Sequence, residues 1–304
     1  MCMIIGEDEP VHVSNTNIFV GKLASDGVSS PRQFTVYSNI VQSQNVNAND
    51  VGIWSGNRAP MPTIVSGNGP FELPSNRSPQ TNNMAMILPV PSTGKWVKNK
   101  PMIEFYAMDG KYEEVFSKLE SLFPAYEKLQ RQSFSYNAGA DGISEDEEIE
   151  VHQVGSYDVS IVPSLDKFDY LQHDIFELDK GFQSLLKRDY NQGYAFVVCK
   201  LRNGEKFHPI AYSHPMTPDG KLFIPTKHYH NKSESGADWD HSIYILNGDV
   251  NNSINFTPGL NYRESMLHHQ VIDTPFVQAP ATKIGKLAVD WAYKNNHDLL
   301  ISVH

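Results

Sequence analysis

The chain of 304 residues is 40% hydrophobic and 11% aromatic, a composition typical of folded globular proteins that excludes a disordered chain. Its net charge of −10, with no cluster of Lys and Arg, argues against nucleic-acid binding, because phosphate recognition needs concentrated positive charge. No run of about 18 apolar residues could cross a membrane, and the start lacks the basic region of a secretory signal. We therefore expect a soluble, cytoplasmic protein without a membrane partner.

The first predicted element is a β-hairpin. Residues 17–23 and 33–42 are rich in β-branched and aromatic side chains, and the turn-forming sequence ASDGVSSP separates them. Residues 44–83 follow, and Asn, Gly, Pro and Ser dominate them. We expect this segment to be an extended surface excursion or an arm that contacts a protein partner or supports self-assembly.

A buried strand over residues 84–90 and an amphipathic helix over residues 112–123 are predicted next. The helix carries its apolar side chains at helical spacing, namely Tyr112, Val115, Phe116, Leu119, Leu122 and Phe123. Residues 137–150, which include the run SEDEEIE, predict an acidic, solvated loop.

The second half alternates between strands and helices. Strands are predicted over 157–162, 194–201, 207–213, 222–224, 227–230 and 242–246. A short helix capped by Ser164 and an amphipathic helix after Asp179 lie between the first two of these strands. A last helix is predicted over 283–293, where apolar residues recur on one side. Together these elements predict a single α+β domain over residues 1–304, with mixed, largely antiparallel sheets and a few amphipathic helices packed on them.

Eight segments, taken in order, resemble a family of proteins encoded by bacteria and some large viruses. They are SNTNIFVGKL, QFTVYSN, MAMILPVP, VGSYDVSIVPSLDKFDYL, GYAFVVCKL, HPIAYSHP, LFIPTKHYH and ADWDHSIYIL. The resemblance covers most of the chain except residues 44–83. Because no activity is established for that family, the resemblance implies a common fold and no catalytic residue.

A histidine-rich stretch is the first candidate for chemistry. His228 and His230 are two residues apart, so on a strand both rings would lie on the same face and reach one cation. Asp240 or His241, or alternatively Asp238, could supply a further ligand, and such a set suits Zn²⁺ or non-haem Fe²⁺. The spacing alone is also that of two half-exposed strand histidines, because it lacks the fixed partner spacing of an HExxH motif.

Cys2 is the second candidate. After removal of Met1 it would carry a thiol beside a free α-amine, which can act as the base in N-terminal-nucleophile hydrolases. The following Met3 and Ile4 lack the small residues expected after such a nucleophile. The other cysteine, Cys199, lies in an apolar run and is expected to be a core residue, so the two cysteines fit a reducing compartment.

Three functions follow from these residues. The first is a non-catalytic structural or interaction protein that uses residues 44–83, and the sequence favours it because no strong catalytic motif is present. The second is a metal-dependent enzyme or metal-binding protein that uses His228 and His230. The third is a hydrolase that uses Cys2.

Overall fold

The computed structural model describes part of the chain. The described residues are 2–5, 11–23, 31–43, 85–92, 103–106, 108, 114–123, 149, 151–171, 180–202, 208–230, 241–247, 259–268, 274, 276–277, 281–289 and 297–302. Residues 44–83, most of the acidic run at 137–150, and Asp240 lie outside them, so the predictions made for these positions stay predictions.

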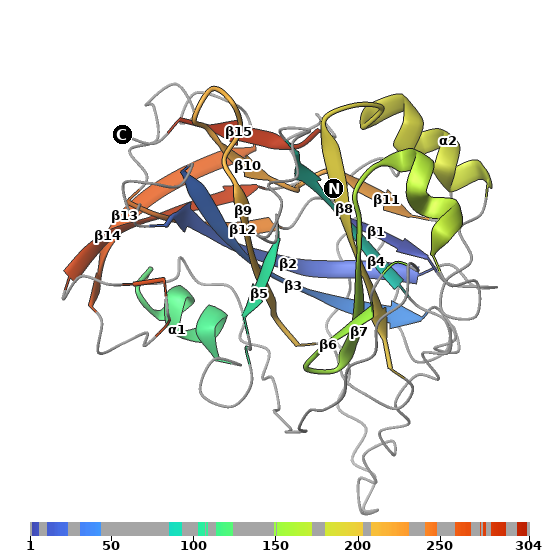
Figure 1. Cartoon of the computed structure of the whole chain (residues 1–304). Coiled ribbons are helices and arrows are strands. Elements are labelled where there is room, and N and C mark those ends of the chain that lie inside the picture. The colour runs from blue at the N-terminus through green and yellow to red at the C-terminus, as the bar shows by residue number, and fades with distance from the viewer. Residues whose placement is uncertain are drawn as a thin grey trace, which may run out of the picture.

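A seven-stranded sheet forms one half of the described structure (Figure 1). Its strands in spatial order are β13 (Leu260–His268), β14 (Ala281–Val289), β12 (His241–Leu246), β2 (Val11–Lys22), β3 (Arg32–Ser43), β9 (Ile210–Pro215) and β5 (Glu104–Tyr106). All neighbours pair antiparallel except β12 and β2, which are parallel. The hairpin of β2 and β3 was predicted and is confirmed.

A six-stranded sheet forms the other half. Its strands in spatial order are β11 (His228–His230), β1 (Cys2–Ile5), β4 (Ala85–Pro91), β8 (Tyr194–Leu201), β7 (Tyr157–Val162) and β6 (Val151–Val154). Only β1 and β11 pair parallel. A separate pair consists of β10 (Leu222–Ile224) and β15 (Leu299–Ile301).

The helices cover the outer faces of the two sheets. Helix α1 (Val115–Ser121) packs on the seven-stranded sheet, whereas η2 (Leu165–Tyr170) and α2 (Lys180–Asp189) pack on the six-stranded sheet. The largest core cluster lies between the sheets, since it combines Ile18 and Val20 of β2 with Met86 and Leu88 of β4. The order of layers is therefore helix, sheet, sheet, helices.

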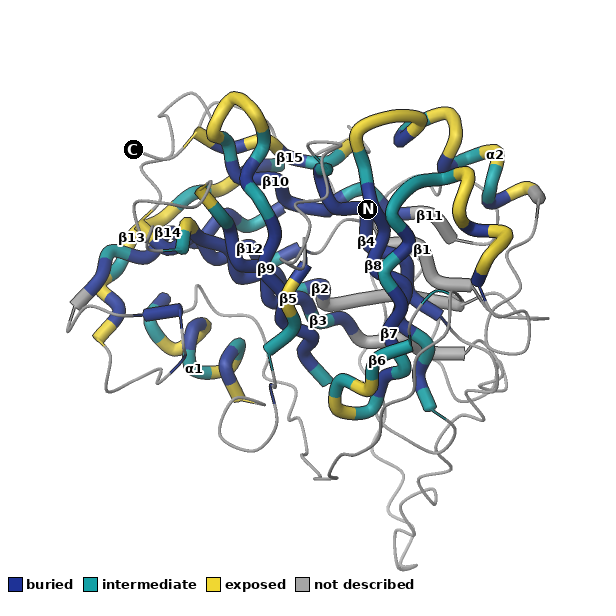
Figure 2. The backbone as a smooth tube through the Cα atoms, in the orientation of Figure 1, coloured by how far each residue is buried: buried dark blue, intermediate teal, exposed yellow. Residues whose placement is uncertain are grey.

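Burial on both faces explains why the central strands are apolar almost throughout. Along β2, Ile18 and Val20 face the core between the sheets, whereas Phe19 faces α1. Along β4, Met86 and Leu88 face that same core, whereas Ile87 faces α2. Figure 2 shows these strands as buried along most of their described length. The prediction that residues 194–201 form a strand buried on both faces is confirmed.

The helix predicted over residues 283–293 is wrong for residues 283–289, which belong to β14, and residues 290–293 lie outside the described residues. The spacing of Ile284, Leu287 and Ala288 matches one face of a helix, but it also arises in a strand whose two faces are both buried. Ile284 packs under α1, whereas Leu287 packs between the sheets. Since β14 pairs with β12 and β13 on its two sides, tertiary pairing overrides the local pattern.

The prediction of mixed, largely antiparallel sheets with few helices is confirmed, although strands contribute more and helices less than the sequence indicated. Among the described residues, no helix is both long and apolar enough to cross a membrane.

Candidate functional site

Two buried histidines lie in contact where the two sheets meet. His228 is the first residue of β11 and His241 is the first residue of β12, and their exposed fractions are 6% and 3%. The ring centroids are 4.4 Å apart, with the rings nearly perpendicular, and the two Nε2 atoms hydrogen-bond to each other. When both rings are neutral, one Nε2 therefore donates and the other accepts.

The strand pattern places His241 on the inner side of its sheet. Side chains alternate along a strand, so His241 shares a face with Ile243 and Ile245, which belong to the core between the sheets. The histidine pair therefore links the six-stranded sheet, through β11, to the seven-stranded sheet, through β12.

Polar contacts at Lys227 position β11. The Lys227 ammonium lies 2.9 Å from a carboxylate oxygen of Asp189 in α2, and its backbone N–H donates to Asp298 at 2.8 Å. Asp298 also accepts a hydrogen bond from the Tyr190 hydroxyl. Burial, together with the charge of Asp298, raises the pKa of Tyr190, which keeps this hydroxyl protonated as a donor.

Strand pairing brings Cys2 next to the histidines. In the parallel pair of β1 and β11, Cys2 is the partner of His228 and Ile4 is the partner of His230. Residues paired in this way lie on the same face of a sheet. The two candidates that the sequence offers separately, Cys2 and the pair of His228 and His230, are thus neighbours in strand register, and the side chains of Cys2 and His230 lie outside those that the structure describes.

The predicted metal ligands are described only in part. His228 and His241 are in contact, His230 is described as part of β11 but its side chain is not, and Asp240 lies outside the described residues. Among the side chains that the structure describes, no group of three or more His, Cys, Asp or Glu could hold a metal ion. What the described geometry offers is two imidazoles whose Nε2 atoms contact each other.

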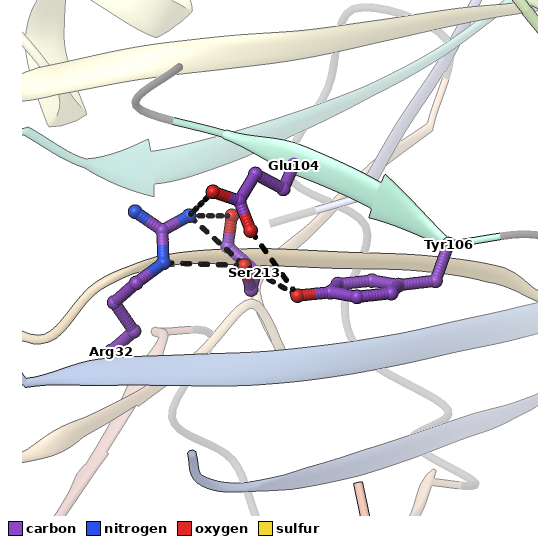
Figure 3. A network of polar contacts seen from close by, with 4 residues as sticks. All are labelled: Arg32, Glu104, Tyr106 and Ser213. Atoms are coloured by element: carbon purple, nitrogen blue, oxygen red, sulfur yellow. Dashed lines mark hydrogen bonds and ion pairs between the residues drawn. The ribbon is translucent and has the colours of Figure 1, made fainter. Parts of the chain in front are cut away.

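Sequence reasoning missed a polar network on the seven-stranded sheet (Figure 3). Arg32 on β3 donates to the Ser213 hydroxyl on β9 at 2.9 Å and to the Ser213 carbonyl at 3.0 Å. Tyr106 on the edge strand β5 donates to the same hydroxyl at 3.1 Å, and Glu104 lies 4.0 Å from Arg32. The network fastens the short strand β5 to the sheet, and no sequence motif could have indicated it because Arg32 and Ser213 are 181 residues apart.

Two further histidines have structural roles. His208 accepts a hydrogen bond through Nε2 from the Ser156 N–H at 2.7 Å, which holds the turn between β6 and β7. His214 is fully buried, and its Nδ1 donates to the Pro215 carbonyl at 2.7 Å. Within the described part of the chain, Nε2 of His214 has no hydrogen-bond partner. Burial lowers the pKa of His214 to about 4, so the ring is neutral at pH 7.

An ion pair fastens α1 to its sheet. One carboxylate oxygen of Glu120 accepts hydrogen bonds from the Lys286 ammonium on β14 and from the Tyr244 hydroxyl on β12. The Lys286 side chain is only 7% exposed, so the ion pair lies against the sheet and largely out of solvent on the lysine side. Burial and the hydrogen bond to Glu120 raise the pKa of Tyr244, which therefore stays protonated.

An open pocket of about 350 Å³ lies between η2 and α2. Asp166, Asp169, Gln183, Lys187 and Gln192 are among its lining residues. Its charges are mixed, and Asp166 is fully exposed, with a pKa lowered by its hydrogen bond to Ser164. We assign no chemistry to this pocket.

No protein-family model and no curated protein sequence matches the chain. Among solved structures, the chain is similar to the crystal structure of baculovirus P35, with 12% sequence identity, a TM-score of 0.44, and coverage of 96% of this chain and 97% of that one. It is also similar to a mutated baculovirus P35 after caspase cleavage, with 11% identity, the same TM-score, and coverage of 96% and 100%. At this identity and TM-score, the likeness identifies neither a family nor a function for the chain.

Proposed function

We propose that the protein acts by binding another protein, and that residues 44–83 make the contact. In this proposal the two sheets are a non-catalytic scaffold that holds both ends of the segment. The observation that carries the proposal is the placement of these two ends.

The segment leaves and re-enters the scaffold at nearby points. Ser43 pairs with Val11, and Ala85 pairs with Ile5. Only six residue steps separate Ile5 from Val11, so their Cα atoms are at most about 21 Å apart, and Ser43 and Ala85 at most about 32 Å. The 42 steps between Ser43 and Ala85 could span about 140 Å, so most of the segment is not needed to connect the strands.

The composition of the segment supports binding over core formation. Its 40 residues include eight Asn, four Gly, five Pro and four Ser, together with two acidic and two basic side chains. Trp54 and Phe71 are its aromatic residues, and aromatic residues are those that most often dominate binding energy at an interface. With no net formal charge, the segment would bind through aromatic anchors and amide hydrogen bonds, and long-range charge attraction would contribute little.

The test begins with replacement of residues 45–82 by a Gly/Ser linker of about 12 residues, which still spans the two ends. A matched control replaces the acidic residues 137–148 in the same way. A photo-crosslinking amino acid at position 54 identifies the partner, and the same group at Tyr170, which is 59% exposed on η2, is the control position. The partner is then purified, and its Kd is measured with each variant.

We expect the first linker variant to keep its circular dichroism and melting temperature and to lose binding, whereas the second keeps both. Trp54→Ala should weaken binding about 30-fold, which corresponds to about 2 kcal/mol for an anchor residue. Equal Kd values for the wild type and the first linker variant would refute the proposal. A homodimer that disappears in that variant would assign the segment to self-assembly, which is the other outcome of the experiment.

A further inference from the structure

The histidine pair lies at a junction that a bound ion could stabilise. His228 and His241 come from different sheets, both are more than nine-tenths buried, and their Nε2 atoms face each other. Nε2 is the ring atom with which histidine most commonly binds metals, and two such atoms at one point form half of a tetrahedral ligand set.

Two more residues of types that bind metals occupy neighbouring register positions in the sheet. Cys2 is paired in register with His228, and neighbouring strands are about 4.8 Å apart. His230 follows His228 by two residues in β11, and residues two apart share one face of a strand. The pairing of β1 with β11 thus places one cysteine and two histidines on one face, with His241 contacting that face from the opposite sheet.

We propose that Cys2, His228, His230 and His241 bind one Zn²⁺ ion between the two sheets. A thiolate and imidazoles are borderline-soft ligands, so they favour Zn²⁺ over Mg²⁺ or Ca²⁺, which prefer oxygen. Four protein ligands leave no open position, so the ion is structural and links β1 and β11 to β12. A site of this kind gives Cys2 a role as a metal ligand, which differs from the nucleophile of a hydrolase.

The experiment uses the full chain, freed of metal with a chelator and kept reduced. It is titrated with Co²⁺, which reports a bound thiolate through a ligand-to-metal charge-transfer band, and then with Zn²⁺ in competition. We expect one Co²⁺ per chain, with complete displacement by Zn²⁺. Cys2→Ser should abolish the charge-transfer band. The matched control Cys199→Ser, at a cysteine buried in β8, should keep the band.

Histidine variants test the other ligands. His228→Gln and His241→Gln should each weaken Zn²⁺ binding about 100-fold or more, since changes to residues outside the ligand set already cost about 10–100-fold. His268→Gln, at an exposed histidine on β13, should bind as the wild type does. Near-UV circular dichroism without metal shows whether each variant is folded.

A measurement on the wild type alone keeps the proposal open to refutation if the variants do not fold. Zn²⁺ should slow the alkylation of Cys2 by iodoacetamide at least tenfold, with the modified cysteine located by peptide mass. Unchanged alkylation, a charge-transfer band that persists in Cys2→Ser, or equal affinity in His228→Gln and the wild type would each overturn the metal site. Rapid alkylation that Zn²⁺ leaves unchanged would also favour the nucleophile role over the ligand role.

Discussion

Glu120→Gln removes the carboxylate that fastens α1 to the seven-stranded sheet. Glutamine keeps the size of the side chain and an oxygen that can still accept from Tyr244, but it removes the negative charge beside Lys286. The Lys286 side chain is 7% exposed, and breaking a buried ion pair typically costs about 3–5 kcal/mol. Because the Glu120 side chain itself is 49% exposed, water screens the pair, and we expect a smaller loss of about 2 kcal/mol in the free energy of unfolding.

The same helix supplies the control. Glu114 and Lys118 form an ion pair of 3.9 Å with side chains that are 68% and 39% exposed. Such a pair contributes about 0–1 kcal/mol, so Glu114→Gln should cost less than about 0.5 kcal/mol. Urea unfolding at pH 7, followed by circular dichroism, gives both values. If Glu120→Gln costs no more than Glu114→Gln, the contact between Glu120 and Lys286 does not hold the helix in place.

Leu119→Ala should lower the free energy of unfolding by about 2–5 kcal/mol, because Leu119 of α1 is fully buried against the seven-stranded sheet, whereas Leu300→Ala, at a leucine that is 55% exposed, should cost much less in the same urea titration. His214 has a pKa of about 4 in the folded protein against 6.5 unfolded, so its contribution is complete above pH 6.5 and is lost as the pH falls towards 4. That contribution is about 3 kcal/mol. His214→Gln should therefore flatten the pH dependence of the free energy of unfolding between pH 4 and 6.5 by that amount. Parallel curves for the variant and the wild type would show that the buried His214 ring does not cause this pH dependence. Gly155→Ala should lower the free energy of unfolding by about 2 kcal/mol, because Gly155 has a φ of +58° and an added Cβ would lie 2.2 Å from Nε2 of His208. A melting temperature equal to that of the wild type would show that the turn between β6 and β7 accommodates the methyl group without strain.

Local sequence was sufficient where a strand or helix carries its own pattern. The strands over residues 157–162, 194–201 and 222–224 were predicted with the bounds that the structure shows, because each is a short apolar run closed by turn residues. Helix α1 (Val115–Ser121) is shorter than the predicted range 112–123 at both ends, yet its buried residues Val115 and Leu119 belong to the predicted apolar face.

Local sequence was not sufficient where long-range pairing decides. Residues 281–289 have an apolar spacing that suits a helix as well as a buried strand, and only pairing with β12 and β13 decides between them. The candidate site depends on pairing even more strongly, since Cys2 and His228 are 226 residues apart in the sequence. His241 is one of several residues near in sequence that could join His228 as a ligand, and no pattern in the sequence distinguishes it from Asp240.

The place of β1 in its sheet also constrains the order in which the chain can fold. This strand lies between β4 and β11, so one of its two edges is paired only after residue 230 has been synthesised. At about 5–20 residues per second, roughly 11–45 s separate the synthesis of β1 from that of β11. Once β4 (Ala85–Pro91) has been synthesised, and until β11 follows, β1 can pair with β4 alone, and its other edge is exposed to other chains. Completion of the six-stranded sheet is therefore a late, non-local event, and slow translation or crowded ribosomes would favour aggregation through this edge.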